Sequence, residues 1–169
     1  QRLEFPKVKG GNSIVIIHTT NDEYGINYSV EWDCNIKSQR WSCYQMYAKN
    51  RVQKTKRYYS DYNQYPFDPD MPAGFYFDYD PFWGSGFDHG HICPSADRLY
   101  SSAANIQTFY LTNMQPQHNA FNTGLWEKME EKLRSWISTG SKAEDTLYVC
   151  KGGTIDVVDS DGGVKDPVI

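Results

Sequence analysis

Residues 87–98, FDHGHICPSADR, bring together side chains that can move protons. His89 and His91 stand on either side of a glycine, and Asp88 comes directly before them. A histidine ring can accept a proton at neutral pH, which suits His91 to the role of a general base. A histidine pair in a loop is more often structural, however, so this motif alone is a weak signal.

The segment TNMQPQHNAFNTGLWEKMEE, residues 112–131, makes that signal stronger. Asn113, Asn122 and Glu130 follow one another at spacings of nine and eight residues, across a loop and the start of a helix. An amide oxygen is a hard ligand of the kind that Mg²⁺ accepts while it keeps most of its waters. Hydrolysis of a phosphodiester requires a nucleophilic water, a countercharge for the growing negative charge and protonation of the leaving oxygen, and a base and a metal ion can supply these.

Together, the two segments resemble the DNA/RNA non-specific endonuclease family, whose active site is a ββα-metal (His-Me) finger. That family's signature reads Asp-Arg-Gly-His, Ala-Pro, Asn-x-x-Pro-Gln, Asn-x-Gly-x-Trp and a Glu in the same helix. The corresponding residues here are Asp88-His89-Gly90-His91, Cys93-Pro94, Asn113-Met114-Gln115-Pro116-Gln117, Asn122-Thr123-Gly124-Leu125-Trp126 and Glu130. The match runs from about Arg57 to Gly152.

The resemblance implies a metal-dependent enzyme that hydrolyses DNA and RNA and leaves 5′-phosphate ends. His91 would be the general base, and Asn122 would hold one Mg²⁺ ion, with Mn²⁺ as the alternative. Glu130 would contact the metal through water, and Asn113 would orient the catalytic centre. Asn122 also suits the N-cap of a helix, and both roles are open. Asp88 is expected to orient the site or stabilise a turn.

Three basic residues are candidates for contact with the substrate phosphate. Arg57 lies in KTKRYYSDY, which resembles a phosphate-binding segment of the family, and a guanidinium matches two phosphate oxygens. His89 replaces the usual arginine; it either adds a pH-dependent charge or only packs and hydrogen-bonds. Arg98 could touch the backbone of the nucleic acid, although a solvated surface position is its default interpretation.

Charge and hydropathy narrow the function classes. The net charge is −4 and the pI about 5.5, which argues against a passive nucleic-acid binder with a basic surface. Contact with DNA and RNA is therefore expected through the phosphate backbone at a catalytic site, with little sequence specificity. No stretch approaches the roughly 20 apolar residues that span a bilayer.

Four cysteines permit three disulfide pairings. A hairpin centred between Ser38 and Gln39 would place Cys34 opposite Cys43, which favours that pair and leaves Cys93–Cys150. Free buried thiols are the alternative. If the disulfides form, the protein works outside the cytosol, as a secreted, periplasmic or cell-surface enzyme.

We expect one α+β domain over residues 1–169, with its C-terminal segment missing. The resemblance implies a central, mostly antiparallel sheet with flanking helices and the ββα finger. Periodicity predicts strands at residues 13–18, 26–32, 41–48, 109–114, 147–150 and 154–158, and a helix from about 122 to 140. Residues 60–86, which are rich in Pro, Asp, Asn and Gly, are predicted to form a long surface loop.

Two other functions are compatible with the same residues. A structural zinc module could use His89, His91, Cys93 and Cys150, because the first three alternate along the chain. Alternatively, the fold could survive as a binding domain whose catalysis has decayed, as the histidine at position 89 suggests. Mg²⁺-dependent cleavage would favour the enzyme over both.

Overall fold

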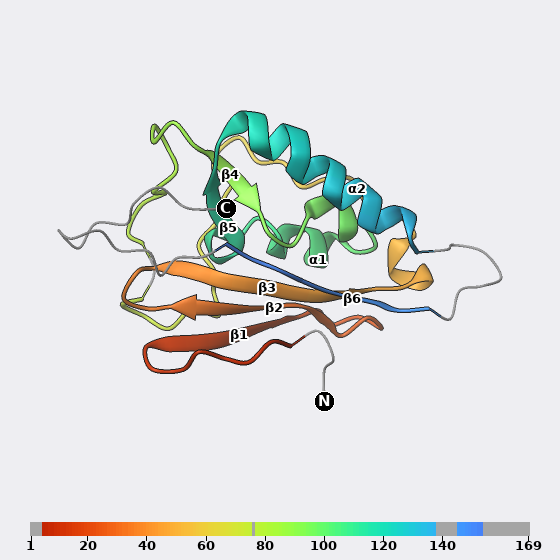
Figure 1. The fold of residues 1–169 in the computed structure, drawn as a ribbon, viewed down its shortest axis with the longest axis horizontal. Coiled ribbons are helices and arrows are strands. Elements are labelled where there is room, and N and C mark those ends of the chain that lie inside the picture. Colours follow the sequence, from red (N-terminus) through yellow and green to blue (C-terminus); the bar gives the residue numbers. More distant parts are fainter. Residues whose placement is uncertain (1–4, 76, 138–144, 154–169) are drawn as a thin grey trace.

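Two antiparallel sheets and a few short helices form the α+β architecture of the protein (Figure 1). The computed structural model describes residues 5–75, 77–137 and 145–153. The strands are β1 (Ser13–Thr19), β2 (Ile26–Asp33), β3 (Ser38–Met46), β4 (Asp88–His91), β5 (Met114–Gln117) and β6 (Leu147–Lys151). The helices are η1 (Ala48–Arg51), η2 (Ser95–Asp97), α1 (Ser102–Gln107), η3 (Leu111–Asn113), the π-helical η4 (Phe121–Trp126) and α2 (Glu127–Ser135).

The larger sheet has the order β1-β2-β3-β6, and β4, β5 and the helices cover one of its faces (Figure 1). As predicted, Tyr28, Val30 and Trp32 alternate on the buried face of β2. The opposite face of β2 is buried as well. There the carboxylate of Glu31 accepts hydrogen bonds from Trp41 Nε1 (2.6 Å) and from the backbone of Lys9 (2.8 Å).

The β2–β3 hairpin turns earlier than predicted. Asp33 pairs with Ser38, so the turn lies at residues 34–37 and is not centred between residues 38 and 39. The side chain of Asp33 stabilises this turn, because its Oδ1 accepts from the backbone N–H groups of Asn35 (3.0 Å) and Ile36 (3.1 Å). Lys37 adopts a positive φ of 53° to complete it.

This register moves the cysteines away from their predicted partners. Cys43 lies opposite Ser29 on one side and Cys150 on the other. Cys34 and Cys93 are both free thiols, so the predicted pairs Cys34–Cys43 and Cys93–Cys150 are wrong. The location outside the cytosol, which rested partly on these pairs, stays a prediction.

The finger consists of β4, β5 and the helix that follows them. β4 and β5 are antiparallel, with Gly90 opposite Gln115 and His91 opposite Met114. β5 begins at residue 114, whereas a strand was predicted over residues 109–114; residues 111–113 form η3 instead. Between η1 and β4, the described part of residues 52–87 contains no helix or strand, as the prediction of a long loop requires.

The helix of the finger starts close to its predicted position, but its apolar side chains are less buried than expected. Its first turns are π-helical, and α2 ends at Ser135. Leu125, Met129 and Trp136 are exposed, whereas Ile137 is buried. The helix therefore ends about five residues before the end predicted near residue 140. The strand predicted at 154–158 lies outside the described residues.

Candidate active site

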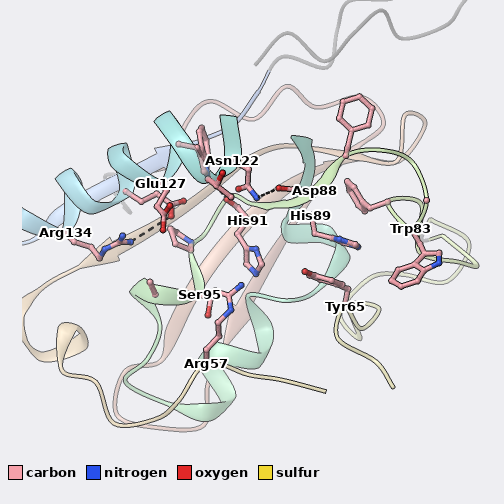
Figure 2. Close-up of a pocket in the computed structure, with 18 residues that line it drawn as sticks. Arg57, Tyr65, Trp83, Asp88, His89, His91, Ser95, Asn122, Glu127 and Arg134 are labelled. Carbon is pink, nitrogen blue, oxygen red and sulfur yellow. Dashed lines mark hydrogen bonds and ion pairs between the residues drawn. The ribbon is translucent and has the colours of Figure 1, made fainter. Parts of the chain in front are cut away.

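A cleft of about 540 Å³ opens between the finger and the long loop (Figure 2). Its volume is within the range of about 300–1,000 Å³ that is typical of ligand sites. Residues of β4, of the helix of the finger and of the long loop line it. The lining includes Arg57, Tyr65, Trp83, Asp88, His89, His91, Asn122, Glu127, Glu130 and Arg134.

His91 lies at the centre of the cleft in a defined tautomer (Figure 2). Its ring forms a hydrogen bond with the backbone of His89, and its Nε2 has no partner among the described residues. The bond therefore involves Nδ1–H and the carbonyl of His89, which leaves the lone pair on Nε2. Burial, followed by the positive charge of Arg57, lowers the pKa of His91 to about 3. The ring is thus neutral at physiological pH and can accept a proton.

A hydrogen bond and a steric constraint both act on the backbone around His91. Trp126 Nε1 donates to the carbonyl oxygen of His91 (3.1 Å), which gives the motif tryptophan a structural reason. A side chain at position 90 would require Gln117 to move, because a Cβ on Gly90 would lie 2.3 Å from Cδ of Gln117. Packing as well as chemistry therefore favours glycine between the two histidines.

Asp88 sets the orientation of Asn122. The Oδ2 of Asp88 accepts hydrogen bonds from Nδ2 of Asn122 and Nδ2 of Asn119, both at 3.0 Å (Figure 2). An ionised carboxylate can only accept, so the amide nitrogen of Asn122 faces Asp88 and its oxygen points elsewhere. Asn122 lines the cleft, and its amide oxygen is available as a ligand for a cation.

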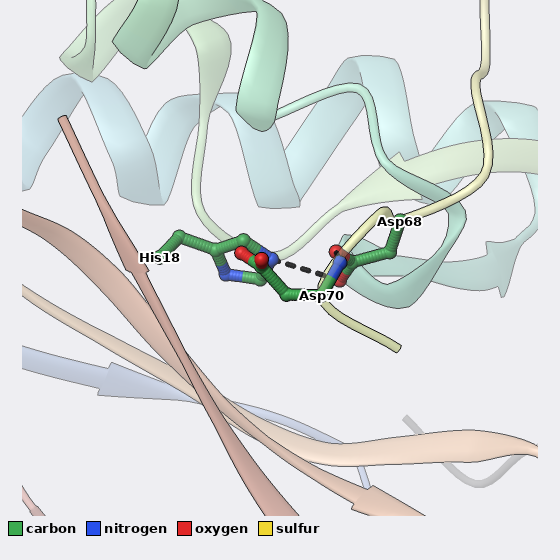
Figure 3. Close-up of side chains that lie close together, drawn as sticks. All are labelled: His18, Asp68 and Asp70. Carbon is green, nitrogen blue, oxygen red and sulfur yellow. Dashed lines mark hydrogen bonds and ion pairs between the residues drawn. The ribbon is translucent and has the colours of Figure 1, made fainter. Parts of the chain in front are cut away.

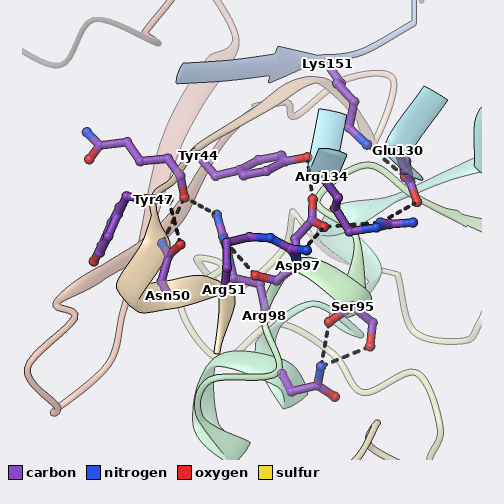
Figure 4. Close-up of polar contacts among 12 residues, drawn as sticks. Tyr44, Tyr47, Asn50, Arg51, Ser95, Asp97, Arg98, Glu130, Arg134 and Lys151 are labelled. Atoms are coloured by element: carbon purple, nitrogen blue, oxygen red, sulfur yellow. Dashed lines mark hydrogen bonds and ion pairs between the residues drawn. The ribbon is translucent and has the colours of Figure 1, made fainter. Parts of the chain in front are cut away.

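Glu130 also lines the cleft, but its carboxylate is tied to cationic neighbours (Figure 4). Lys151 Nζ on β6 donates to Glu130 Oε1 (2.8 Å), and Arg134 NH1 lies 4.0 Å from Oε2. Burial raises the pKa of Glu130, and Lys151 opposes that shift. The contact of Glu130 with metal-bound water stays a prediction.

The wall opposite the helix contains Arg57 and a stack of rings. The guanidinium of Arg57 lies 4.8 Å from the ring centre of Phe109. His89 stacks on Tyr65 at 3.5 Å with nearly parallel rings, and its Nε2 lies 2.8 Å from Oδ2 of Asp80. His89 therefore packs and hydrogen-bonds, as one of its two interpretations required, while it still lines the cleft.

Asn113, a predicted catalytic residue, lies outside the cleft. It is fully buried, and its Nδ2 donates to the carbonyls of Cys93 (2.9 Å) and Thr108 (2.8 Å). Its Oδ1 accepts from the backbone of Cys93 (2.9 Å) and from Ser42 Oγ (3.1 Å). The amide thus holds the chain two residues after His91 against η3 and the large sheet.

The expectation that Arg98 contacts phosphate is wrong. Its side chain is fully buried, donates to the backbone carbonyls of Asp97 (2.9 Å) and Gln45 (3.1 Å), and lies over the ring of Tyr44. Nearby, the carboxylate of Asp97 receives Arg134 at 3.2 Å, so the whole cluster forms an internal network (Figure 4). A guanidinium in this network cannot reach a substrate.

The zinc alternative fails on the positions of its ligands. Among the described residues, the only group of three or more His, Cys, Asp or Glu side chains close enough to share a metal ion is His18, Asp68 and Asp70 (Figure 3). Cys93 is buried, which raises the pKa of its thiol to about 12 and disfavours the thiolate that zinc requires.

The His18 cluster is separate from the cleft, since none of its three residues lines it. His18 Nε2 lies 2.8 Å from Asp68 Oδ2, which also accepts from the hydroxyl of Thr112 (Figure 3). These contacts link β1 to the long loop and to η3. The cluster therefore lies apart from the residues of the cleft.

Sequence reasoning missed several residues of the cleft. Arg134 follows Glu130 by four residues, so the same-face spacing of a helix could have indicated it. Glu127, three residues before Glu130 on the same helix, is exposed in the cleft. Tyr65 and Trp83 come from the long loop, where no periodicity pointed to them.

A two-stranded antiparallel sheet followed by a helix, with a histidine base on the strand and an asparagine at the helix start, defines the ββα-finger nuclease class. The family model for DNA/RNA non-specific endonucleases matches residues 12–163. The chain therefore belongs to the DNA/RNA non-specific endonuclease family, as the sequence motifs predicted.

Relatives and a solved structure agree with this assignment. The chain is 30% identical over 123 residues to mitochondrial nuclease EXOG of Xenopus laevis, covering 68% of this chain and 34% of that protein. It is 41% identical over 93 residues to nuclease C1 of Cunninghamella echinulata var. echinulata, covering 54% and 35%. In a crystal structure of the EndoG/EndoGI complex, one chain shares the fold, with a TM-score of 0.68 and 23% identity over 92% of this chain and 61% of that chain.

The matched region spans about a third of the length of these two curated relatives. No described helix has the length and apolar character needed to cross a membrane.

Proposed function

We propose that the protein is a metal-dependent endonuclease that hydrolyses phosphodiester bonds of DNA and RNA. The observation that carries this proposal is the state of His91: a neutral ring in the cleft, with Nδ1 held by a backbone carbonyl and Nε2 unpartnered among the described residues. A neutral imidazole with a free lone pair is the form of histidine that can take a proton from water. Its membership of the family supports the same chemistry.

In this mechanism Nε2 of His91 takes a proton from the attacking water. The carbonyl of His89 holds the ring through Nδ1–H, and Trp126 holds the backbone that carries it. Arg57 is the cation for the substrate phosphate, because it lines the cleft on the same side as His91 and its guanidinium can form two hydrogen bonds with a phosphate.

The residues of the cleft fit a single Mg²⁺ ion, with Mn²⁺ as the alternative. The amide oxygen of Asn122 faces away from Asp88 and would be the protein ligand, and Glu130 would contact a water of the ion. When bound, the metal supplies positive charge near the phosphate and lowers the pKa of water in its shell. Asp88 keeps the amide of Asn122 in the orientation that this role requires.

Digestion of supercoiled plasmid and of total RNA tests the proposal. The parent protein should degrade both with Mg²⁺ and neither with EDTA. His91→Ala should be at least about 100-fold slower, since a general base contributes about 10²–10⁴ in rate. His118→Ala is the matched control, because His118 is exposed on the same finger and outside the cleft; it should match the parent.

The ends of the products test the position of cleavage. We expect 5′-phosphates, so that polynucleotide kinase labels the fragments only after phosphatase treatment. A parent protein that binds nucleic acid but leaves both substrates intact with Mg²⁺ and with Mn²⁺ would instead indicate the decayed binding domain.

A further inference from the structure

Trp83 is exposed to an unusual degree for its size. Its side chain is 86% exposed, although it lines the cleft that contains His91. None of the ring contacts among the described residues involves it. An indole left in water beside a binding site has surface available for a ligand, because its burial on binding releases ordered water.

The turn that carries Trp83 is anchored on both sides. The carbonyl of Phe82 accepts from the backbone N–H of Ser85 (3.1 Å) and from its hydroxyl (2.7 Å). Asp80 Oδ1 accepts from the backbone of Phe82 (2.9 Å), while Asp80 Oδ2 is paired with His89 at 2.8 Å. One carboxylate thus ties the turn of Trp83 to the strand that carries the base.

The rings next to Trp83 are already engaged. His89 lies between Tyr65, at 3.5 Å, and Phe82, at 4.9 Å, so these three rings pack on one another. They form a firm support, and Trp83 extends beyond it at one end of the cleft. Glu127 and Arg134 lie at the other end, with His91 between (Figure 2).

Positive charge in the cleft is limited. Arg57 and Arg134 both line it, but Arg134 is committed to Asp97 at 3.2 Å, and the whole chain carries a net charge of −4. Phosphate attraction alone therefore provides little affinity. An aromatic contact with a base provides affinity without charge and accepts every base, because each has a π-face.

We propose that Trp83 is a stacking platform for an unpaired base next to the scissile phosphate, and that it makes single-stranded DNA and RNA the preferred substrates. In a duplex both faces of each base are covered by neighbours, and exposing one costs unstacking energy. An unpaired base stacks on the indole without that cost. This inference rests on the nuclease function proposed above.

Cleavage of a single-stranded oligonucleotide and of its duplex tests the platform. Trp83→Ala should lower the single-strand-to-duplex ratio of kcat/KM by about 5- to 150-fold, the range that corresponds to loss of one stacked base. Trp83→Phe should fall between. Trp136→Ala, which removes an exposed tryptophan outside the cleft, should leave the ratio unchanged.

Binding provides a second measurement that does not need turnover. In a His91→Ala background, Trp83→Ala should raise the Kd for a labelled single strand by a factor similar to the loss in the cleavage ratio. This factor should be the same at low and high salt. Arg57→Ala should reduce the affinity for the single strand most strongly at low salt. An unchanged ratio together with an unchanged Kd would overturn the platform.

The two proposals fail in different ways. A parent protein that cleaves neither substrate would overturn the nuclease, while the Kd of the Trp83 variants would still decide whether the indole binds bases. A parent that cleaves both, with a Trp83→Ala variant that retains the parent's ratio and Kd, would overturn the platform alone.

Discussion

Asn113 lies at the end of η3, directly before β5 of the finger, and Asn122 lies in the helix of the finger, yet the surroundings of their side-chain amides differ. Asn113 is fully buried, and both ends of its amide are engaged by four hydrogen bonds. Asn122 lines the cleft, and its one described bond uses the nitrogen and leaves the oxygen. An asparagine in a motif is therefore a clamp or a ligand according to which of its atoms the fold has already used.

The largest expected effect follows from replacing Asn122, the proposed metal ligand. Asn122→Ala should lower Mg²⁺-dependent cleavage by more than about 100-fold, because it removes the proposed protein ligand of the metal. The thermal midpoint should move little, since only one hydrogen bond to Asp88 is lost. Cleavage assays over a Mg²⁺ titration and melting curves in EDTA measure both. Full activity at low Mg²⁺ would contradict the role of Asn122.

Replacing Asn113 should mainly reduce stability, the opposite of what is expected for Asn122. Asn113→Ala leaves several buried polar groups without partners, at about 1–3 kcal/mol each, so we expect a loss of about 3 kcal/mol or more in the free energy of unfolding. Urea unfolding monitored by circular dichroism measures it. A variant of full stability and no activity would show that Asn113 takes part in the chemistry after all.

Asp88 is intermediate between the two asparagines. It orients Asn122 through a hydrogen bond, but it is not fully buried as Asn113 is. Asp88→Asn has no ionised acceptor for Nδ2 of Asn122, and we expect Mg²⁺ to bind about 10- to 100-fold more weakly. The apparent Mg²⁺ constant for cleavage should rise by this factor while the rate at saturating Mg²⁺ changes less. An unchanged Mg²⁺ constant would mean that Asn122 is oriented by other groups.

A further effect concerns the stability of the finger at acid pH. The pKa of His91 is about 3 in the folded protein and about 6.5 when unfolded, so the unfolded state binds more protons between these values. The contribution of neutral His91 to the free energy of unfolding is fully present above pH 6.5 and is lost as the pH falls toward 3. Melting of metal-free protein should thus show a shallower acid loss in His91→Ala than in the parent. His118→Ala should keep the slope of the parent.

Much of the fold could be predicted because local pattern and packing agree. The β-branched run of β1 and the alternation of β2 form the strands that periodicity indicates. The hairpin register could not be obtained in this way, since it depends on the bonds of Asp33 in the turn and on a bulge between Glu31 and Trp32. That one shift changed the neighbours of Cys43.

The candidate site was predictable where the motif itself supplies the geometry. His91, Asn122 and Glu130 all line the cleft. Arg98 was misplaced because sequence does not show whether a charged residue has internal acceptors, and here two carbonyls and a ring surround it. Trp83 was not indicated because its position depends on a turn of the long loop.

The limited space for a side chain at Gly90 also constrains which substitutions this finger can accept. A methyl group at position 90 would collide with the side chain of Gln117, which is 27 residues away in the sequence. A variant with alanine at position 90 therefore requires the side chain of Gln117 to move or to be replaced by a shorter one. These two positions should vary as a pair, although they lie on different strands, β4 and β5, and neither lines the cleft.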